Sequence, residues 1–159
     1  MLQLTKKTEY GLIALVHLAD RGGELVSVRE IGERYPIPKR LLAEVLKDLA
    51  RAELVQSQRG ATGGYSLARP ADAITLGQIV EALEGRPQVS NCETSVPHGS
   101  ALPAPTRHSE CEMQGFCRIR APLHRLREHL IEMLEQTTLA SLQTGQTIDH
   151  NLRPRAQAS

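Results

Sequence analysis

The fold is decided by the stretch LVQSQRGATGGYSL at residues 54–67. Residues 54–58 and 65–67 have the composition of short β-strands, and the six residues between them include three glycines. Glycine adopts the backbone conformations of tight turns at little cost, so the stretch predicts a β-hairpin. These glycines could serve turn geometry alone. Arg59, however, stands at the base of the hairpin, where it could reach a DNA phosphate or a narrow minor groove.

Two short helices are predicted just before this hairpin. Ser27 and Glu30 have the spacing of a capping box, in which each side chain satisfies the other residue's backbone donor, and this helix stops before Pro36. A second helix is predicted from Pro38 to about Ala52. Its buried stripe would be Leu42, Val45, Leu46 and Leu49, and its charged face Arg40, Glu44, Lys47 and Arg51. Helix, turn, helix, strand, Arg-Gly hairpin and strand is the order of a winged helix-turn-helix, a DNA-binding fold.

Further helices are predicted on both sides of this unit. Apolar residues recur at helical spacing from Leu4 to Asp20, and the pair of glycines at 22 and 23 ends that helix. Glu9 lies near its start, where a carboxylate suits the positive end of the helix dipole. Thr75 is placed to cap another helix that runs through Glu84.

The C-terminal part predicts a long helix from about Ile119 to Leu142. An almost heptad apolar stripe runs along it, formed by Ile119, Leu123, Leu126, Leu130, Met133 and Thr137. A small domain cannot cover such a stripe, so we expect a partner helix from a second copy of the chain. A two-fold homodimer would match palindromic DNA. Residues 143–159 are polar and without pattern, which predicts a disordered tail.

All three cysteines of the chain, Cys92, Cys111 and Cys117, lie in a stretch between these helices that prolines and glycines interrupt repeatedly. A long irregular segment of this kind is often held by something that it binds. Structural zinc is least favoured because no close cysteine pair is present, although His98 or His108 could complete four ligands. A second interpretation is a reversible disulfide, and a third is an iron–sulfur cluster held by three thiolates and a further ligand.

Composition limits the class of protein. The 159 residues are 40% hydrophobic with no Trp and one Phe, which favours a helical core of aliphatic side chains. The sequence contains neither 18 consecutive apolar residues nor a secretion signal, so we expect a cytoplasmic protein without a membrane partner. A net charge of +1 does not indicate a bulk polyanion binder. Catalysis has little support, because a Cys–His pair with His108 or His124 is too common by chance.

Several segments resemble the Rrf-two family of bacterial winged-helix transcription regulators, which includes IscR-like iron–sulfur assembly regulators and NsrR-like nitric-oxide sensors. The matching segments are LTKKTEYGL at residues 4–12, the hairpin with its flanking strands at 54–68, and ITL at 74–76 leading to EALEG at 81–85. The likeness extends from Leu4 to about Leu142. It implies a mainly α fold with a small β-wing, that is, a winged helix-turn-helix followed by a long C-terminal dimerisation helix.

The resemblance favours an iron–sulfur cluster, because cluster-binding members carry three cysteines in the same loop. It implies that Cys92, Cys111 and Cys117 are ligands and that Glu9 of the other protomer is the fourth, with His98 and His108 as competitors. Eighteen residues separate the first two cysteines here, a longer gap than the family's usual spacing. Cys92 is therefore the least secure ligand. Either [4Fe-4S] or [2Fe-2S] is compatible with this set of ligands.

These observations predict four regions: a winged helix-turn-helix at residues 1–85, a cluster-binding segment at 86–118, a dimerisation helix at 119–142 and a tail at 143–159. The expected function is a homodimeric transcription repressor whose affinity for a palindromic double-stranded operator depends on the cluster. Two further interpretations are a cluster-free regulator controlled by thiols or by a protein partner, and a small iron–sulfur redox protein. The residues expected at DNA are Ser27, Lys39, Arg40, Glu44, Lys47, Arg59, Gly60, Thr62 and Gly63.

Overall fold

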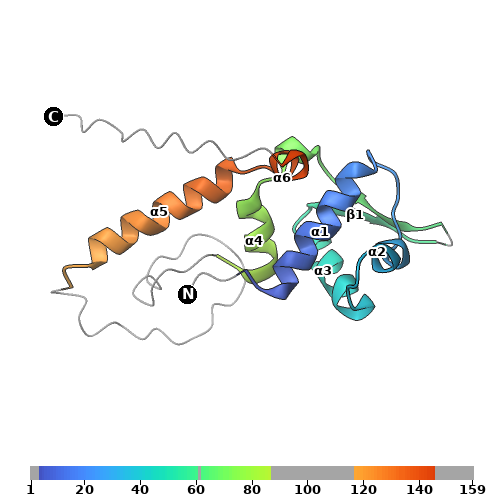
Figure 1. Ribbon diagram of the computed structural model, residues 1–159, viewed down its shortest axis with the longest axis horizontal. Helices are drawn as coiled ribbons and strands as arrows, with labels where there is room; N and C mark the ends of the chain where they lie inside the picture. Colours follow the sequence, from blue (N-terminus) through green and yellow to red (C-terminus); the bar gives the residue numbers. More distant parts are fainter. Residues whose placement is uncertain (1–3, 61, 87–116, 146–159) are drawn as a thin grey trace.

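The protein is mostly helical and carries a two-stranded antiparallel sheet (Figure 1). A computed structural model describes residues 4–60, 62–86 and 117–145. The elements follow in the order α1 (Lys6–Asp20), α2 (Val28–Arg34), α3 (Lys39–Arg51), β1 (Val55–Gln58), β2 (Gly64–Leu67), η1 (Ala71–Ala73), α4 (Leu76–Glu84), α5 (Arg120–Gln136) and α6 (Leu139–Thr144). The predicted fold class, a winged helix-turn-helix with a C-terminal helix, is confirmed.

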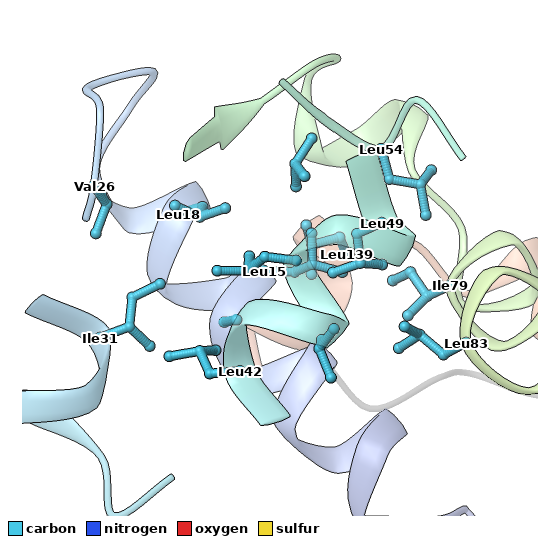
Figure 2. Packing of buried hydrophobic residues seen from close by; sticks show 14 of the residues in the cluster. Leu15, Leu18, Val26, Ile31, Leu42, Leu49, Leu54, Ile79, Leu83 and Leu139 are labelled. Atoms are coloured by element: carbon cyan, nitrogen blue, oxygen red, sulfur yellow. The ribbon is translucent and has the colours of Figure 1, made fainter. Parts of the chain in front are cut away.

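The core is formed by aliphatic side chains, most of them from α1, α3 and α4, with Ile31 of α2 and Leu139 of α6 (Figure 2). The stripe predicted on α3 is fully buried: Leu42, Val45, Leu46 and Leu49 each have no exposed surface. Leu15 of α1 and Ile79 of α4 are equally buried. Burying one such side chain contributes roughly 1.5–3 kcal/mol relative to leaving it exposed. This packing fixes α3 in the core and leaves its opposite face in solvent.

Both predicted N-terminal caps are present, with one correction. Thr75 and Gln78 form a reciprocal capping box at the start of α4. Ser27 accepts a hydrogen bond from the backbone N–H of Glu30 at 3.1 Å, but the carboxylate of Glu30 accepts from the guanidinium of Arg21 instead of from the Ser27 backbone. The predicted capping box of α2 is therefore only half formed, because a cationic donor from the end of α1 competes for the carboxylate.

The wing pairs β1 and β2 in antiparallel register, with Val55 opposite Leu67. Val26 pairs with the other edge of β2, where it exchanges two backbone hydrogen bonds of 2.8 Å with Tyr65. Gly60 has a φ of +128°, as expected for a turn glycine. A β-carbon at Gly63 would overlap the backbone of the opposite side of the turn. The wing glycines therefore serve close backbone approach as well as backbone conformation.

The single helix predicted for residues 119–142 is wrong at its C-terminal end. Helix α5 ends at Gln136, and a second helix, α6, begins at Leu139. Thr137 leaves the helical conformation, and the side chain of Thr138 caps α6. Backbone hydrogen bonds from Leu76 to Thr137 and from Leu139 to Ile74 hold the break against the start of α4. Leu139, which lies within the predicted dimerisation helix, is instead buried in the core.

Several predictions concern residues outside the described ranges. They include the ligands Cys92 and Cys111, the competitors His98 and His108, and most of the tail. Among the helices in the described part of the chain, none is long and apolar enough to cross a membrane.

Candidate nucleic-acid interface and cysteine site

The outer face of α3 carries the side chains predicted to meet DNA. Lys39, Arg40, Glu44 and Lys47 are all exposed. Arg40 and Glu44 form an ion pair of 3.4 Å, in which the Arg40 side chain remains 94% exposed. Lys39 and Lys47 form no ion pair with any residue that the structure describes. Two ammonium groups on the exposed surface of α3 can therefore neutralise phosphates without first breaking an ion pair.

The wing, which follows α3 in the chain, adds a third cation without an ion pair. Arg59 follows β1, is exposed and has no ion-pair partner in the described ranges. Gly60 and Gly63 close the turn through a hydrogen bond of 3.1 Å, and Thr62 between them is exposed. This arrangement presents one guanidinium beside a narrow turn, which suits a phosphate backbone or a narrow groove.

Ser27 has a structural task in addition to its predicted contact with DNA. Its hydroxyl oxygen accepts the Glu30 backbone N–H, and the side chain is half-buried at the start of α2. The Ser27 O–H group is the donor that remains for a phosphate.

Glu9 lies in the first turn of α1 with its carboxylate partly exposed. The carboxylate pairs at 2.5 Å with Lys6, whose side chain is 74% exposed, against 43% for Glu9. A hydrogen bond to Glu9, together with its charge, raises the pKa of Lys6 above the usual range. Exposed pairs of this kind add little stability. The Glu9 carboxylate can therefore exchange Lys6 for a stronger partner such as an iron atom.

Of the four predicted ligands, Glu9 and Cys117 fall within the described residues. Cys117 is a free, half-exposed cysteine three residues before α5. Within the described ranges, no three His, Cys, Asp or Glu side chains lie close enough together to hold a metal ion. Thiolates and a carboxylate are suitable donors for iron, so the chemistry of the predicted set fits a cluster. The geometry of the set involves Cys92 and Cys111, which are outside those ranges.

Helix α5 exposes the apolar stripe that predicted a partner. Ile119, just before the helix, is 62% exposed, and Leu126 is 49% exposed. Leu123, Leu130 and Met133 are half-covered, and Leu134 is buried where α5 approaches α4. The stripe thus remains open over most of the helix, although it is shorter than predicted.

A junction of α1, α3 and α4 was not predicted from the sequence. Lys7 Nζ lies 2.6 Å from Asp48 Oδ2 and donates a hydrogen bond of 3.1 Å to the Leu83 carbonyl. Glu84 accepts hydrogen bonds from the Thr5 backbone N–H, at 2.9 Å, and from the Thr8 hydroxyl. The partners are far apart in the sequence, so no local pattern could have indicated these contacts.

Comparisons with known proteins agree on one family. A family model described as "Rrf2: Iron-dependent Transcriptional regulator" matches residues 4–145. The solved structure of CymR (YrzC), the global cysteine regulator of B. subtilis, is 29% identical with a TM-score of 0.65; the match covers 92% of this chain and 100% of CymR.

Two further solved structures are similarly close. IscR of T. potens is 28% identical with a TM-score of 0.64, over 91% of this chain and 88% of that one. A transcriptional regulator from Listeria innocua is 28% identical with a TM-score of 0.68, over 95% of this chain and 92% of that one.

Proposed function

Because this chain belongs to the Rrf2 family of transcriptional regulators, we propose that it is a homodimeric repressor whose operator affinity is controlled by an iron–sulfur cluster. The family consists of transcription regulators, so the protein is a regulator and not an enzyme. The same match argues against a small iron–sulfur redox protein. The cytoplasm, where the DNA of a bacterium lies, is the proposed location.

The main support for DNA binding is a set of exposed cations without ion-pair partners in the described part of the chain. Lys39 and Lys47 of α3 and Arg59 of the wing need not break an ion pair to meet phosphates. In this proposal the start of α3 enters the major groove and the wing follows the neighbouring backbone. The proposed DNA contacts are Ser27, Lys39, Arg40, Glu44, Lys47, Arg59, Gly60, Thr62 and Gly63.

The open apolar stripe on α5 supports a homodimer. Its 17 residues of helix extend over about 25 Å, long enough to pack against an antiparallel copy of the same helix. Burying Ile119 and Leu126 against their counterparts would remove two of the largest exposed apolar side chains in the described chain from water. A two-fold dimer would present two α3 helices to the half-sites of a palindrome.

The description of the family as iron-dependent supports a metal as the signal. In this proposal Cys92, Cys111 and Cys117 hold a [4Fe-4S] or [2Fe-2S] cluster together with Glu9 of the other protomer. A cluster would supply reversible redox and nitrosylation chemistry, and a carboxylate ligand leaves its iron more labile than a fourth thiolate would. Glu9 and the cysteines would then join two chains, and loss of that link would alter the spacing of the two α3 helices.

A cluster-free regulator of the same fold is the second candidate. It is favoured by the similarity to CymR, which is named as a global cysteine regulator and matches this chain as well as IscR does. In that case the three cysteines would act as thiols, or a protein partner would control DNA binding.

Anaerobic purification separates the two candidates. We expect coloured protein that contains iron and acid-labile sulfide, whereas Cys111→Ala prepared in parallel should be colourless. The DNA affinity of each form would be measured on a duplex selected in vitro with the wild-type protein. Colourless, iron-free wild-type protein that binds the selected duplex would rule out control by a cluster. The cluster-free regulator, controlled by thiols or by a protein partner, would then remain.

A further inference from the structure

Lys7 joins α1 to the recognition helix α3 and to the end of α4. Its ammonium group lies 2.6 Å from the carboxylate of Asp48 and 3.1 Å from the Leu83 carbonyl oxygen. The side chains of Lys7 and Asp48 are 34% and 25% exposed, whereas Arg29 and Glu33 in a surface pair are 80% and 60% exposed. Partial shielding from water strengthens an ion pair, so this contact holds its geometry better than a surface pair does.

Glu84 fastens the same corner of the molecule. Its carboxylate accepts from the Thr5 N–H and the Thr8 hydroxyl, which belong to the cap and first turn of α1. The backbone donors at the start of a helix have no partner inside it, and a carboxylate also suits the positive end of the helix dipole. The start of α1 is therefore attached to the last residue of α4.

Gly11 shows how closely the three helices meet. A β-carbon at this position would overlap the Leu83 side chain of α4 and would lie 3.4 Å from Val45 Cγ1 of α3. A displacement of the start of α1 cannot be absorbed at such a contact without moving α3 or α4, because packed interiors have little free space.

In the sequence, the junction adjoins residues of both the proposed sensor and the proposed reader. Glu9 follows Lys7 by two residues, and the segment with the cysteines begins shortly after Glu84. Asp48 adjoins Lys47 on α3, which carries the proposed DNA contacts. We infer that Lys7 is a positioning residue for DNA recognition: it sets the orientation of α3 and transmits the state of the cysteine site to it. The second half of this inference rests on the proposed function.

A double-mutant cycle in cluster-free protein tests the positioning role. Lys7→Met, Asp48→Asn and the double variant would be compared with wild type on the selected duplex. We expect each single variant to bind about three- to tenfold more weakly, and the double variant to be no weaker than either single one. Removing a carboxylate from a DNA-facing helix would by itself strengthen DNA binding. A loss of DNA affinity in Asp48→Asn would therefore be explained by positioning and not by charge.

The controls separate this role from charge and from folding. Arg86→Met removes one positive charge two residues after Glu84, from an exposed pair with Glu81, and should change the affinity less than about twofold. Lys7→Arg retains the charge and should restore most of the affinity even if Lys7→Met folds poorly. Unchanged affinity in both single variants, or additive losses in the double variant, would overturn the positioning role.

Cluster-loaded protein tests the transmission. In wild type the loaded and cluster-free forms should differ in affinity, whereas in Lys7→Met their ratio should approach one while the visible spectrum stays unchanged. An unchanged ratio would overturn transmission through Lys7. Wild-type protein without iron would instead contradict the proposed function, and the cycle in cluster-free protein would still decide the positioning role.

Discussion

Gly64 lies directly against the backbone of Val26. A β-carbon on Gly64 would come within 2.6 Å of the Val26 carbonyl oxygen and 2.8 Å of its carbonyl carbon. The next residue, Tyr65, exchanges two hydrogen bonds with Val26, so neither segment can retreat without breaking the pairing. The wing is therefore fastened along β2, at the end nearest its turn, to the segment between α1 and α2.

We expect Gly64→Ala to lower the free energy of unfolding by about 1–3 kcal/mol, because backbone atoms rather than a flexible side chain oppose the new methyl group. The matched control is Gly32→Ala in α2, where the nearest atom is Lys39 Cγ at 3.6 Å and helix propensity favours alanine. That variant should gain about 0.5–1 kcal/mol. Urea unfolding of both variants measures the difference, and equal stabilities would contradict the steric argument.

Arg59→Ala should weaken binding to the selected duplex by about 1–3 kcal/mol if Arg59 reads a groove, with the fold and the oligomeric state unchanged. Arg86→Ala is the control, since it removes an exposed arginine that follows α4 in the chain and pairs with Glu81 rather than with a residue of the wing. Titrations at several salt concentrations measure affinity and salt slope together. If Arg59→Ala retained both, the wing would not contact DNA.

Lys39 and Arg40 stand at the start of α3, where a recognition helix meets base edges. The double alanine variant should either select different sequences in vitro or bind all sequences more weakly by a similar factor. Lys47→Ala should do only the latter and reduce the salt slope by about 1, as a phosphate contact does. A double variant with wild-type preference and affinity would mean that another helix enters the groove.

Glu9→Ala should dimerise and bind DNA like the cluster-free protein, and should take up a cluster with an altered spectrum or a shorter lifetime in air. The reason is the loss of the proposed fourth ligand from the other protomer. Anaerobic reconstitution beside wild type measures both properties, and Lys6→Ala controls for the loss of the surface ion pair. Identical spectra and lifetimes would exclude Glu9 as the fourth ligand and leave His98 and His108 as the candidates.

Acid should weaken the attachment of α1 to α4. Burial raises the pKa of Glu84, but the hydrogen bonds from Thr8 and Thr5 and the charge of Lys7 outweigh burial and hold this pKa below the usual 4.5. A lowered pKa in the folded state stabilises the protein above the unfolded value and loses this effect as the pH falls through the folded value. Glu84→Gln should therefore lose less stability than wild type between about pH 5 and pH 3. Urea midpoints across that range measure the effect, and parallel profiles would contradict it.

The sequence predicted those elements whose signals are local. The four leucine and valine positions on α3, the Thr75 cap and the strand–glycine–strand order all act within a few residues, and the structure has each of them. The break before Leu139 was missed because a heptad pattern continues through Thr137, whereas the backbone pairing that ends α5 comes from residues 74–76. The contacts of Lys7 and Glu84 were missed for the same reason, since their partners are remote in the sequence.

Leu139 packs back into the core formed by earlier parts of the chain, and this has a consequence for biosynthesis. The socket that Leu139 fills is formed by residues that leave the ribosome much earlier, and the backbone of Ile74 and Leu76 is paired only when residues 137–139 arrive. Domains fold as units once their residues are available, and here the last of them follow the cysteines. The DNA-reading part therefore completes its fold only on chains in which all three cysteines have already been translated.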